Sequence, residues 1–324
     1  MSVFSIKKLT LAAALVSVTF ISGLGSGLAT AAAPQVKTSA PGYFRLMLGS
    51  FEVTAINDGT VELPVDKLLN NPEPKTHAAL ADSFLKAPLE TSVNAYLINT
   101  GEKLVLIDVG AGTLFGPTLG KFVANLRASG YEPAQIDDIY ITHLHSDHIG
   151  GLVSSNTLAF PNAVVHVDQM DSDFWLSKAN LDKAAPDDKI YYTNASAMLT
   201  PYQAAKKLSP FTKKTQLTSG IKAVSTAGHT AGHSVYEVES QGQKLWLIGD
   251  LIHVAAVQLD HPEVTIAFDS DQKKAAEQRD KIFTQAAKEG ILVGAAHIQF
   301  PGLGHLRKEG KSYDWIPVNF TQIH

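Results

Sequence analysis

The 324-residue chain contains no cysteine, and this absence excludes several kinds of site. Without a thiol there is no disulfide, no thiolate metal site, no cysteine nucleophile and no lipid-modified N-terminal cysteine. Charged residues make up only 18% of the chain, and the formal net charge is −4 without a cluster of Lys and Arg. Because proteins that bind nucleic acids carry basic patches, we expect no nucleic-acid partner.

The chain also lacks an uninterrupted apolar run of the ~20 residues that a membrane-spanning helix needs. The one candidate, residues 9–25, is interrupted by serine and threonine, follows a Lys-Lys pair and precedes a stretch of small residues. This order predicts a secretory signal peptide over residues 1–33, cleaved near Ala31 or Ala33, with an uncleaved membrane anchor as the alternative. The mature protein, residues 34–324, would then be periplasmic or secreted and free of the membrane.

The most informative segment is Thr142 to His148, which directly follows an apolar, strand-like run. It places three histidines and an aspartate close together: His143, His145, Asp147 and His148. Imidazole and carboxylate ligands suit zinc and other first-row divalent ions. In an extended segment His143 and His145 point the same way, because side chains repeat with period two. Asp147 and His148 follow a turn and can reach a second ion. A histidine-rich surface turn is the alternative, and it fits this density poorly.

Further candidate ligands follow other predicted strands. His229 and His233 belong to a Gly-His-Thr-Ala-Gly-His segment, and Asp250 and His297 each end an apolar run. Turns at the ends of neighbouring strands converge on one edge of a sheet, so we expect these side chains to meet the first group there.

The ordered set HxHxDH, GHTxGH, Asp and His resembles the metallo-β-lactamase superfamily over nearly the whole mature chain. The resemblance implies an α+β fold, an αββα sandwich in which two mixed β-sheets are flanked by helices. It also implies two divalent ions, zinc first, with cobalt, manganese or iron(II) as alternatives. One ion would be held by His143, His145 and His229, the other by Asp147, His148 and His297, with Asp250 bridging them. His233 would support the site without binding metal.

As the resemblance implies, such a pair of ions would lower the pKa of a shared water and supply a bridging hydroxide as the nucleophile. Asp250 and Asp147 are the candidate catalytic residues, because Asp250 positions both ions and Asp147 adds negative charge to one. The sequence shows no separate strong general acid. Amide hydrolysis needs protonation of its leaving group, so the chemistry favours esters, lactones or phosphotriesters over peptides.

A narrower resemblance, to methyl parathion hydrolase and its aryl-lactone-hydrolysing relatives, extends through most of the mature chain. Its landmarks are Ala40–Tyr43, Ala87–Ser92, Gly112–Gly120, Phe174–Ser177 and Ala255–Gln258. In these relatives Phe115, Trp175 and Tyr191 would correspond to an aromatic wall that holds an aryl leaving group. Ordinary core packing is the alternative for any one of these aromatic residues.

Four positions distinguish substrates within this group. The resemblance implies arginine, leucine, threonine and leucine in organophosphate specialists, where this chain has Leu68, His253, Ile266 and Phe268. These residues favour a dihydrocoumarin-type aryl lactonase with side phosphotriesterase activity, acting on a small molecule as a homodimer. Neutral variation is the alternative, and His253 could instead lie near Asp250 as a supporting residue. An organophosphate hydrolase proper, a glyoxalase-II-type thioesterase, an acyl-homoserine-lactone lactonase and a non-catalytic metal-binding module remain alternatives.

Periodicity predicts one domain of mixed strands and helices. We expect two hairpins, one from Phe51 to Leu63 turning at Asp58-Gly59 and one joining Val93–Asn99 to Lys103–Asp108. Helices are predicted over Leu119–Ser129 and Gln272–Lys288, and residues 179–210 are predicted to be a long irregular insertion. Further strands are expected at Ile136, over Ala163–Val167, and near Ile221, Val235, Leu245 and Ile291.

Overall fold

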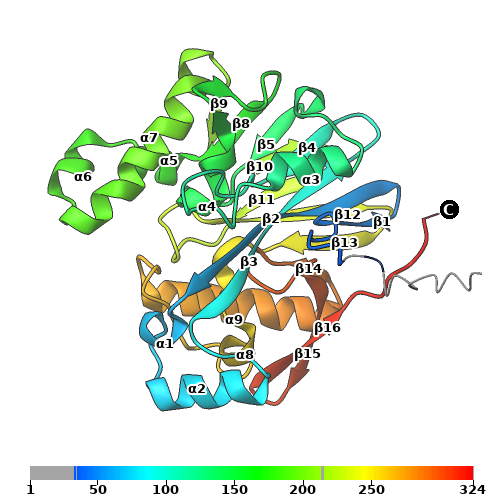
Figure 1. The fold of residues 1–324 in the computed structure, drawn as a ribbon, viewed down its shortest axis with the longest axis vertical. Helices are drawn as coiled ribbons and strands as arrows, with labels where there is room; N and C mark the ends of the chain where they lie inside the picture. The colour runs from blue at the N-terminus through cyan, green and yellow to red at the C-terminus, as the bar shows by residue number, and fades with distance from the viewer. Residues whose placement is uncertain (1–32, 34, 213–214, 324) are drawn as a thin grey trace, which may run out of the picture. The chain divides into compact units, whose positions relative to one another are not determined.

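Two seven-stranded β-sheets form the centre of the fold (Figure 1). In spatial order, the first sheet consists of β1 (Tyr43–Leu48), β2 (Phe51–Leu63), β3 (Leu89–Asn99), β4 (Leu104–Ile107), β5 (Asp138–Tyr140), β8 (Val164–Asp168) and β9 (Leu208–Phe211). The second consists of β10 (Thr215–Thr218), β11 (Ile221–Ser225), β12 (Ser234–Ser240), β13 (Gln243–Leu247), β14 (Leu292–Gly294), β15 (Leu303–Glu309) and β16 (Ser312–Pro317). Both sheets are mixed, because β4, β5, β8 and β9 are parallel neighbours and so are β13 and β14.

The structure describes residue 33, residues 35–212 and residues 215–323 of this computed structural model. Residues 40–324 form one compact unit. The predicted signal peptide lies almost entirely outside the described residues, so both it and the domain boundary at residue 34 stay predictions. In the described part of the chain, no helix has the length and apolar character needed to cross a membrane.

Alternating side chains divide the hydrophobic core into layers. In β3, Tyr96 faces the layer between the two sheets, and its neighbour Leu97 faces the opposite side. In β13, Leu245 faces the same inner layer and Trp246 faces outward. Both outer faces are therefore apolar, as the side-chain period of two requires, and each must be covered by helices.

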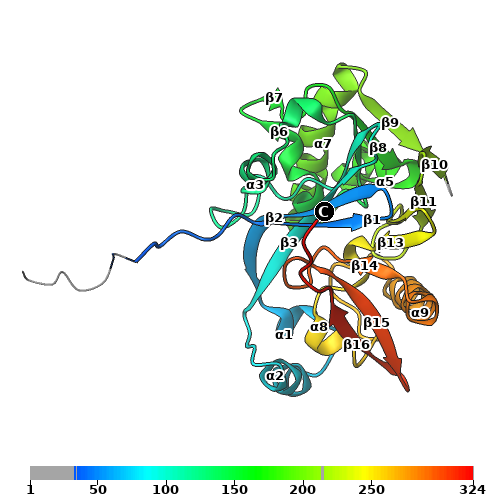
Figure 2. The ribbon, with the colours of Figure 1, turned by 90° about the vertical axis from the view of Figure 1, so that its right-hand side faces the viewer.

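Helices cover these outer faces and confirm the predicted αββα sandwich (Figures 1 and 2). The first sheet packs against α3 (Phe122–Ala128), α5 (Gln169–Trp175) and α7 (Lys189–Ala204), and the second against α9 (Gln272–Glu289). Three further helices, α1 (Val65–Leu68), α2 (Glu73–Asp82) and α8 (Ala255–Gln258), share a smaller hydrophobic cluster at one end of the sandwich. The predicted helices at 119–129 and 272–288 are confirmed as α3 and α9, and the second hairpin is confirmed as β3 and β4.

The predicted turn at Asp58-Gly59 is wrong, because β2 runs through it as one strand with a bulge. The buried carboxylate of Asp58 accepts the backbone N–H groups of Ala111 and Phe122, each at 2.9 Å. Gly59 adopts a φ of +131°, and a Cβ there would lie 2.1 Å from the carbonyl oxygen of Thr118. The Asp-Gly pair thus anchors the loop that precedes α3, a long-range use of two residues that usually mark a turn.

The predicted irregular insertion over 179–210 is also wrong. It contains α6 (Lys178–Lys183), the short 3-10 helix η3 (Pro186–Asp188), α7 and β9. The buried side chains of α7 follow helical spacing: Tyr192, Ala195, Leu199 and Tyr202. Asn194, Thr200 and Pro201 lie between them and conceal that spacing in the sequence.

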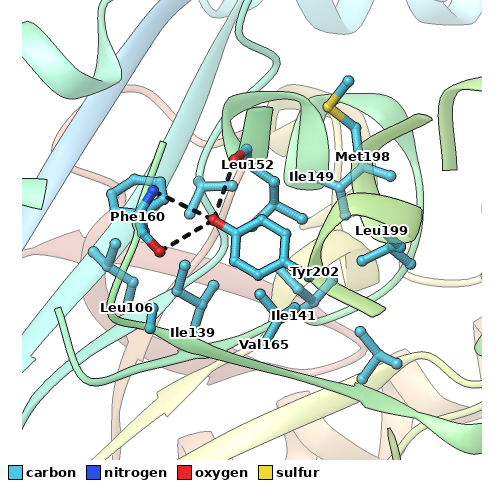
Figure 3. Packing of buried hydrophobic residues seen from close by; sticks show 14 of the residues in the cluster. Leu106, Ile139, Ile141, Ile149, Leu152, Phe160, Val165, Met198, Leu199 and Tyr202 are labelled. Atoms are coloured by element: carbon cyan, nitrogen blue, oxygen red, sulfur yellow. Dashed lines mark hydrogen bonds between the residues drawn. The ribbon is translucent and has the colours of Figure 1, made fainter. Parts of the chain in front are cut away.

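Tyr202 fixes the last turn of α7 in the core of the first sheet (Figure 3). Its side chain is fully buried, and its hydroxyl lies 3.2 Å from the carbonyl oxygen of Leu152 and 3.3 Å from the backbone nitrogen of Phe160. Because the hydroxyl donates to one group and accepts from the other, this ring joins α7 to the segment between α4 (Ser146–Ile149) and β8.

Two substitutions of Tyr202 should therefore lower the stability of the protein by different amounts. Tyr202→Phe should lower the free energy of unfolding by ~1 kcal/mol, since only the hydroxyl's hydrogen bonds are lost. Tyr202→Ala should lower it by about 3–5 kcal/mol, because a cavity is added. Urea unfolding followed by circular dichroism measures both. Ile190→Ala, at an exposed position of the same helix, is the control and should change the value by less than ~0.5 kcal/mol. Equal effects of Tyr202→Ala and Ile190→Ala would contradict the anchoring role.

Candidate metal centre

The predicted ligands lie in loops and short helices that follow strands of both sheets. His143 and His145 come between β5 and α4, and His229 lies between β11 and β12. Asp250 lies in η4 (Gly249–Leu251) after β13, and His297 follows β14. The position of each residue after a strand agrees with the sequence analysis, and the structure brings all of them together.

The side chains form two groups that share Asp250. In the first, the ligand atoms of His143, His145, His229 and Asp250 all lie within 4.8 Å of one another. In the second, the same limit holds for Asp147, His148 and His297. The Asp250 carboxylate lies 3.3 Å from His229 Nε2 and 3.0 Å from His148 Nε2, so it contacts both groups. These groups correspond to the two predicted ligand sets, and their binding of metal stays a prediction.

Several polar atoms in this cluster have no suitable partner in the protein. His148 Nε2 and Asp250 Oδ1 are buried and 3.0 Å apart, yet neither makes a hydrogen bond within the described residues. His229 Nε2 lies 3.2 Å from His143 Nε2 and 3.0 Å from His145 Nδ1. Leaving buried polar atoms unsatisfied is costly. Cations placed among these lone pairs would remove that cost, so the residues present fit two divalent ions.

Three histidines are oriented by a hydrogen bond at the ring nitrogen that faces away from the cluster. His148 Nδ1 lies 2.8 Å from Asp108, His229 Nδ1 lies 2.9 Å from Asp269, and His297 Nδ1 lies 3.0 Å from the carbonyl oxygen of Ser92. Each bond directs Nε2 into the site, as partners of metal-binding histidines do. These partners were not predicted from the sequence. Asp108 follows β4, the same kind of position that identified Asp250, so that signal was present.

Burial and neighbouring charges shift the pKa values of the clustered side chains. Burial lowers the pKa of His143 and of His145 well below the usual range. Burial also lowers the pKa of His229, but hydrogen bonds to Asp250 and Asp269 outweigh it and raise this pKa to about 9. Burial alone raises the pKa of Asp250, yet the imidazoles around it, His148 first among them, hold that pKa well below the usual range. Asp250 is therefore an ionised carboxylate at neutral pH.

His233 supports the backbone of Asp250, as expected of a residue outside the ligand set. Its Nδ1 lies 2.8 Å from the hydroxyl of Thr226, and its Nε2 accepts the Asp250 N–H at 3.1 Å. Asp171 joins the two histidine loops by accepting the backbone N–H of Leu144 at 3.0 Å and that of Gly232 at 2.6 Å. Sequence periodicity gave no indication of Asp171, because it lies on α5 outside the histidine motifs.

Arg279 on α9 holds the segment that carries Asp250 and Asp269. Its side chain is fully buried, and its Nε donates to the carbonyl oxygen of Leu251. Its Nη1 donates to the carbonyl oxygen of Val264 at 2.8 Å, and its Nη2 lies 4.0 Å from the Asp269 carboxylate. One guanidinium thus fixes both ends of the chain segment between the two aspartates.

A cavity of about 460 Å³ opens beside the cluster. Of the predicted substrate-binding residues, it is lined by Phe115, Trp175, Tyr191, His253 and Phe268. The other lining residues outside the predicted set are Val61, Leu63, Phe174, Asp188, Tyr192, Ala267, Asp269 and Ser270. The ring of Trp175 lies close to two other rings that line the cavity. Its centroid is 6.3 Å from that of Tyr191 and 5.5 Å from that of His145, one of the candidate ligands.

Comparison with known proteins identifies the family. Residues 89–297 match the family model of the Metallo-beta-lactamase superfamily. The chain belongs to this superfamily. The structure of the hydrolase AbOPH, described as in the beta lactamase superfamily, superposes with a TM-score of 0.84 at 37% identity, covering 88% of this chain and 100% of that one. AidC, a dizinc quorum-quenching lactonase in complex with its product, superposes with a TM-score of 0.81 at 27% identity, covering 87% and 99%.

Curated relatives match over shorter stretches. Ribonuclease Z from Pyrococcus furiosus is 36% identical over 75 residues, which are 23% of this chain and 22% of that protein. The match thus spans less than a quarter of the relative's length. Membership of the metallo-β-lactamase superfamily is shown by the family model and the structural neighbours, and the expectation of no nucleic-acid partner stays a prediction.

Two of the predicted pocket residues do not line the cavity. Ile266 is fully buried in the cluster formed with α1 and α8, and Leu68 packs against the same cluster. The carbonyl oxygen of Leu68 accepts the backbone N–H of Ala267 at 2.8 Å. Any influence of these two residues on a substrate would therefore pass through Ala267 and Phe268, which do line the cavity.

Metal content tests the ligand assignment directly. Elemental analysis of protein purified from metal-supplemented medium should give close to two divalent ions per chain. Asp250→Ala should lose both ions together, since Asp250 is the one predicted ligand assigned to both ions. His261→Ala, at an exposed histidine outside the cluster, should retain both. A metal content near zero in the unmodified protein would overturn the assignment.

Removing the partner of His229 should weaken metal binding without removing a ligand. We expect Asp269→Ala to lower metal affinity about 10–100-fold, because the ring of His229 loses its orienting hydrogen bond. Asp269→Asn keeps an oxygen acceptor and should lose less. Competition with a chromophoric chelator measures both affinities. Asp260→Ala, at an exposed carboxylate on the same segment, is the matched control, and an equal loss in that variant would show that Asp269 has no special role.

Proposed function

We propose that this protein is a binuclear metal-dependent hydrolase of aryl lactones and aryl esters, with side activity on phosphotriesters. The observation that carries the proposal is a cluster of two histidine-aspartate groups sharing Asp250, open to a cavity with an aromatic wall. His143, His145 and His229 would hold one ion and Asp147, His148 and His297 the other, with zinc the expected metal. When bound, the ions supply a water activated at neutral pH and polarise the attacked oxygen.

The aromatic side chains of the cavity wall would orient the aryl group of a substrate. The indole of Trp175 and the ring of Tyr191 stand beside His145, so an aryl group stacked on them lies next to the first ligand group. Phe115 is 41% exposed and extends the apolar wall outward. Burial of an aryl ring against such walls is worth ~25 cal/mol per Å² of apolar surface.

The lining also limits the leaving groups. Besides the candidate ligands, the titratable side chains at the cavity are Asp188, Asp269, His253 and the tyrosines, and neither lysine nor arginine is among the described residues there. Burial raises the pKa of Tyr191, so it donates a proton poorly at neutral pH. A phenolate needs no proton to leave, whereas an amine does. This supports aryl esters and aryl lactones over amides as substrates.

An acyl-homoserine-lactone lactonase is the second candidate, favoured by the 27% identity to AidC over 87% of this chain. An organophosphate hydrolase proper would use the same ions with a different substrate preference. A non-catalytic metal-binding module would bind metal and hydrolyse none of these substrates. We also propose that the protein is exported through its N-terminal signal and acts in the periplasm or outside the cell as a homodimer.

Specificity distinguishes these functions. We expect the metal-loaded protein to hydrolyse dihydrocoumarin with a much higher kcat/KM than methyl parathion or N-hexanoyl-homoserine lactone. His253 and Phe268, whose ring centroids are 6.1 Å apart, would crowd the alkoxy groups that only the triester carries. Combining His253→Leu with Phe268→Leu should raise kcat/KM for methyl parathion and lower it for dihydrocoumarin. Each misfit is worth ~1–3 kcal/mol, or about tenfold to two-hundredfold.

Metal content of the double variant is the control, because His253 Nε2 lies 3.0 Å from Asp250 and its loss could disturb the ions. The substrate ratio is meaningful only while both ions are retained. A wild-type preference for methyl parathion, or an unchanged ratio in the fully loaded double variant, would contradict the pocket assignment.

A further inference from the structure

Carboxylates are prominent among the charged side chains that line the cavity. Four aspartates line it, and none of the described lining residues is lysine or arginine. Asp147 and Asp250 belong to the candidate ligand set, and Asp269 is bonded to His229. Three of the four carboxylates are therefore matched to imidazoles or to the proposed ions.

Asp188 is the fourth, and it differs from the others. It is exposed at the end of η3, where it precedes α7 without accepting a side-chain capping hydrogen bond. It has no ion-pair partner within the described ranges. Tyr191 and Tyr192 follow on the first turn of α7 and also line the cavity. The charge of Asp188 reaches both rings, since burial first and then Asp188 raise the pKa of Tyr192, and burial, Asp147 and Asp188 raise that of Tyr191.

The aromatic side chains that line the cavity also favour cations over anions. Phe174 and Trp175 pack edge to face, with ring centroids 5.0 Å apart, and Trp175 and Tyr192 lie 4.9 Å apart. The faces of such rings carry partial negative charge, so they attract cations and repel anions. The buried Trp175 Nε1 has no hydrogen-bond partner among the described residues.

We propose that this cavity selects uncharged or cationic aromatic substrates over anionic ones, and that Asp188 at its mouth sets this preference. The proposal rests on the proposed hydrolase function and narrows its substrates. It disfavours carboxylated thioesters, phosphate monoesters and phosphodiesters, all of which approach as anions. Like charges at a cleft mouth lower the rate of encounter, and salt screens the effect.

The same charge acts on the product. In lactone hydrolysis water adds its oxygen to the carbonyl carbon, the ring C–O bond breaks, the phenol oxygen takes one proton and the new carboxylic acid releases one. A neutral substrate thus becomes a carboxylate in a cavity that has Asp188 among its lining residues. Asp188 would repel this anion, so it would favour release and limit product inhibition.

The test compares two neighbouring aspartates. Asp188→Lys and Asp188→Asn are matched with Asp187→Lys and Asp187→Asn, because Asp187 is exposed on the same 3-10 helix but does not line the cavity. The probes are 4-nitrophenyl acetate (neutral), mono-4-nitrophenyl succinate (anionic) and the 4-nitrophenyl ester of trimethylglycine (cationic). Values of kcat/KM are measured at low and high salt, with inhibition by 3-(2-hydroxyphenyl)propanoate, the product of dihydrocoumarin.

At low salt the wild type should disfavour the anionic ester by about tenfold or more relative to the neutral one, and salt should narrow the gap. Asp188→Lys should raise the anionic-to-neutral ratio by about tenfold and tighten inhibition by the product. Asp188→Asn should also raise the anionic-to-neutral ratio and tighten inhibition by the product, but to a smaller extent. The Asp187 variants should leave both values as in the wild type.

Equal use of neutral and anionic esters by the wild type, or equal shifts in the Asp187 and Asp188 variants, would overturn this inference and leave the proposed function standing. Failure to hydrolyse any ester or lactone would instead contradict the proposed function. Quenching of tryptophan fluorescence by coumarin and by the anionic product would then still test the charge preference, because Trp175 lines the cavity. Tighter binding of the anion would refute it.

Discussion

The carboxylate of Asp250 is the interaction on which the rest of the site depends. It is buried, and imidazole nitrogens of His148 and His253 lie 3.0 Å from it, with those of His229 and His297 within 3.3 Å. A charge removed from water in this way is stable only when opposite charge and hydrogen bonds surround it. The fold therefore has to deliver several histidines to one carboxylate, and much of the irregular backbone between strands serves that requirement.

The backbone at Asp250 shows how narrow this requirement is. Gly249 adopts a φ of +51°, and a Cβ there would lie 2.8 Å from His233 Nε2, the atom that accepts the Asp250 N–H. Glycine is thus needed both for the conformation and for the close approach. The first sheet supplies His143 and the second supplies Asp250, so the site exists only when the inner core holds the two sheets together.

The ligand set could be predicted from the sequence because its chemistry is local. The histidines follow strands, and the strand that precedes each can be recognised by its apolar run. The residues that orient them could not be found in this way, because Asp269 is 40 positions from His229 and their contact depends on tertiary packing. The same reason explains the error at Asp58, where a pair typical of turns is used to bind a distant loop.

The error at α7 had a different cause. Its buried residues follow helical spacing, but polar residues and Pro201 between them obscure it. For Leu68 and Ile266 the resemblance implied a place in the pocket, whereas the structure places them in the hydrophobic cluster behind it. A resemblance indicates which positions lie near a substrate site. Whether a side chain at such a position lines the cavity or is buried behind it depends on the packing of this chain.

The two ends of α7 have different structural roles. At its last turn Tyr202 is buried in the core, so substitutions there would lower the stability of the fold. Its first turn, with Asp188 just before it, borders the cavity and contributes none of the candidate ligands. Substitution of exposed residues beside the cavity, such as Asp188, would therefore leave the histidines and the core in place, whereas Tyr192 in the same region is buried. A change of substrate preference could thus come from exposed residues at this helix end while the fold and the candidate ligands stay the same.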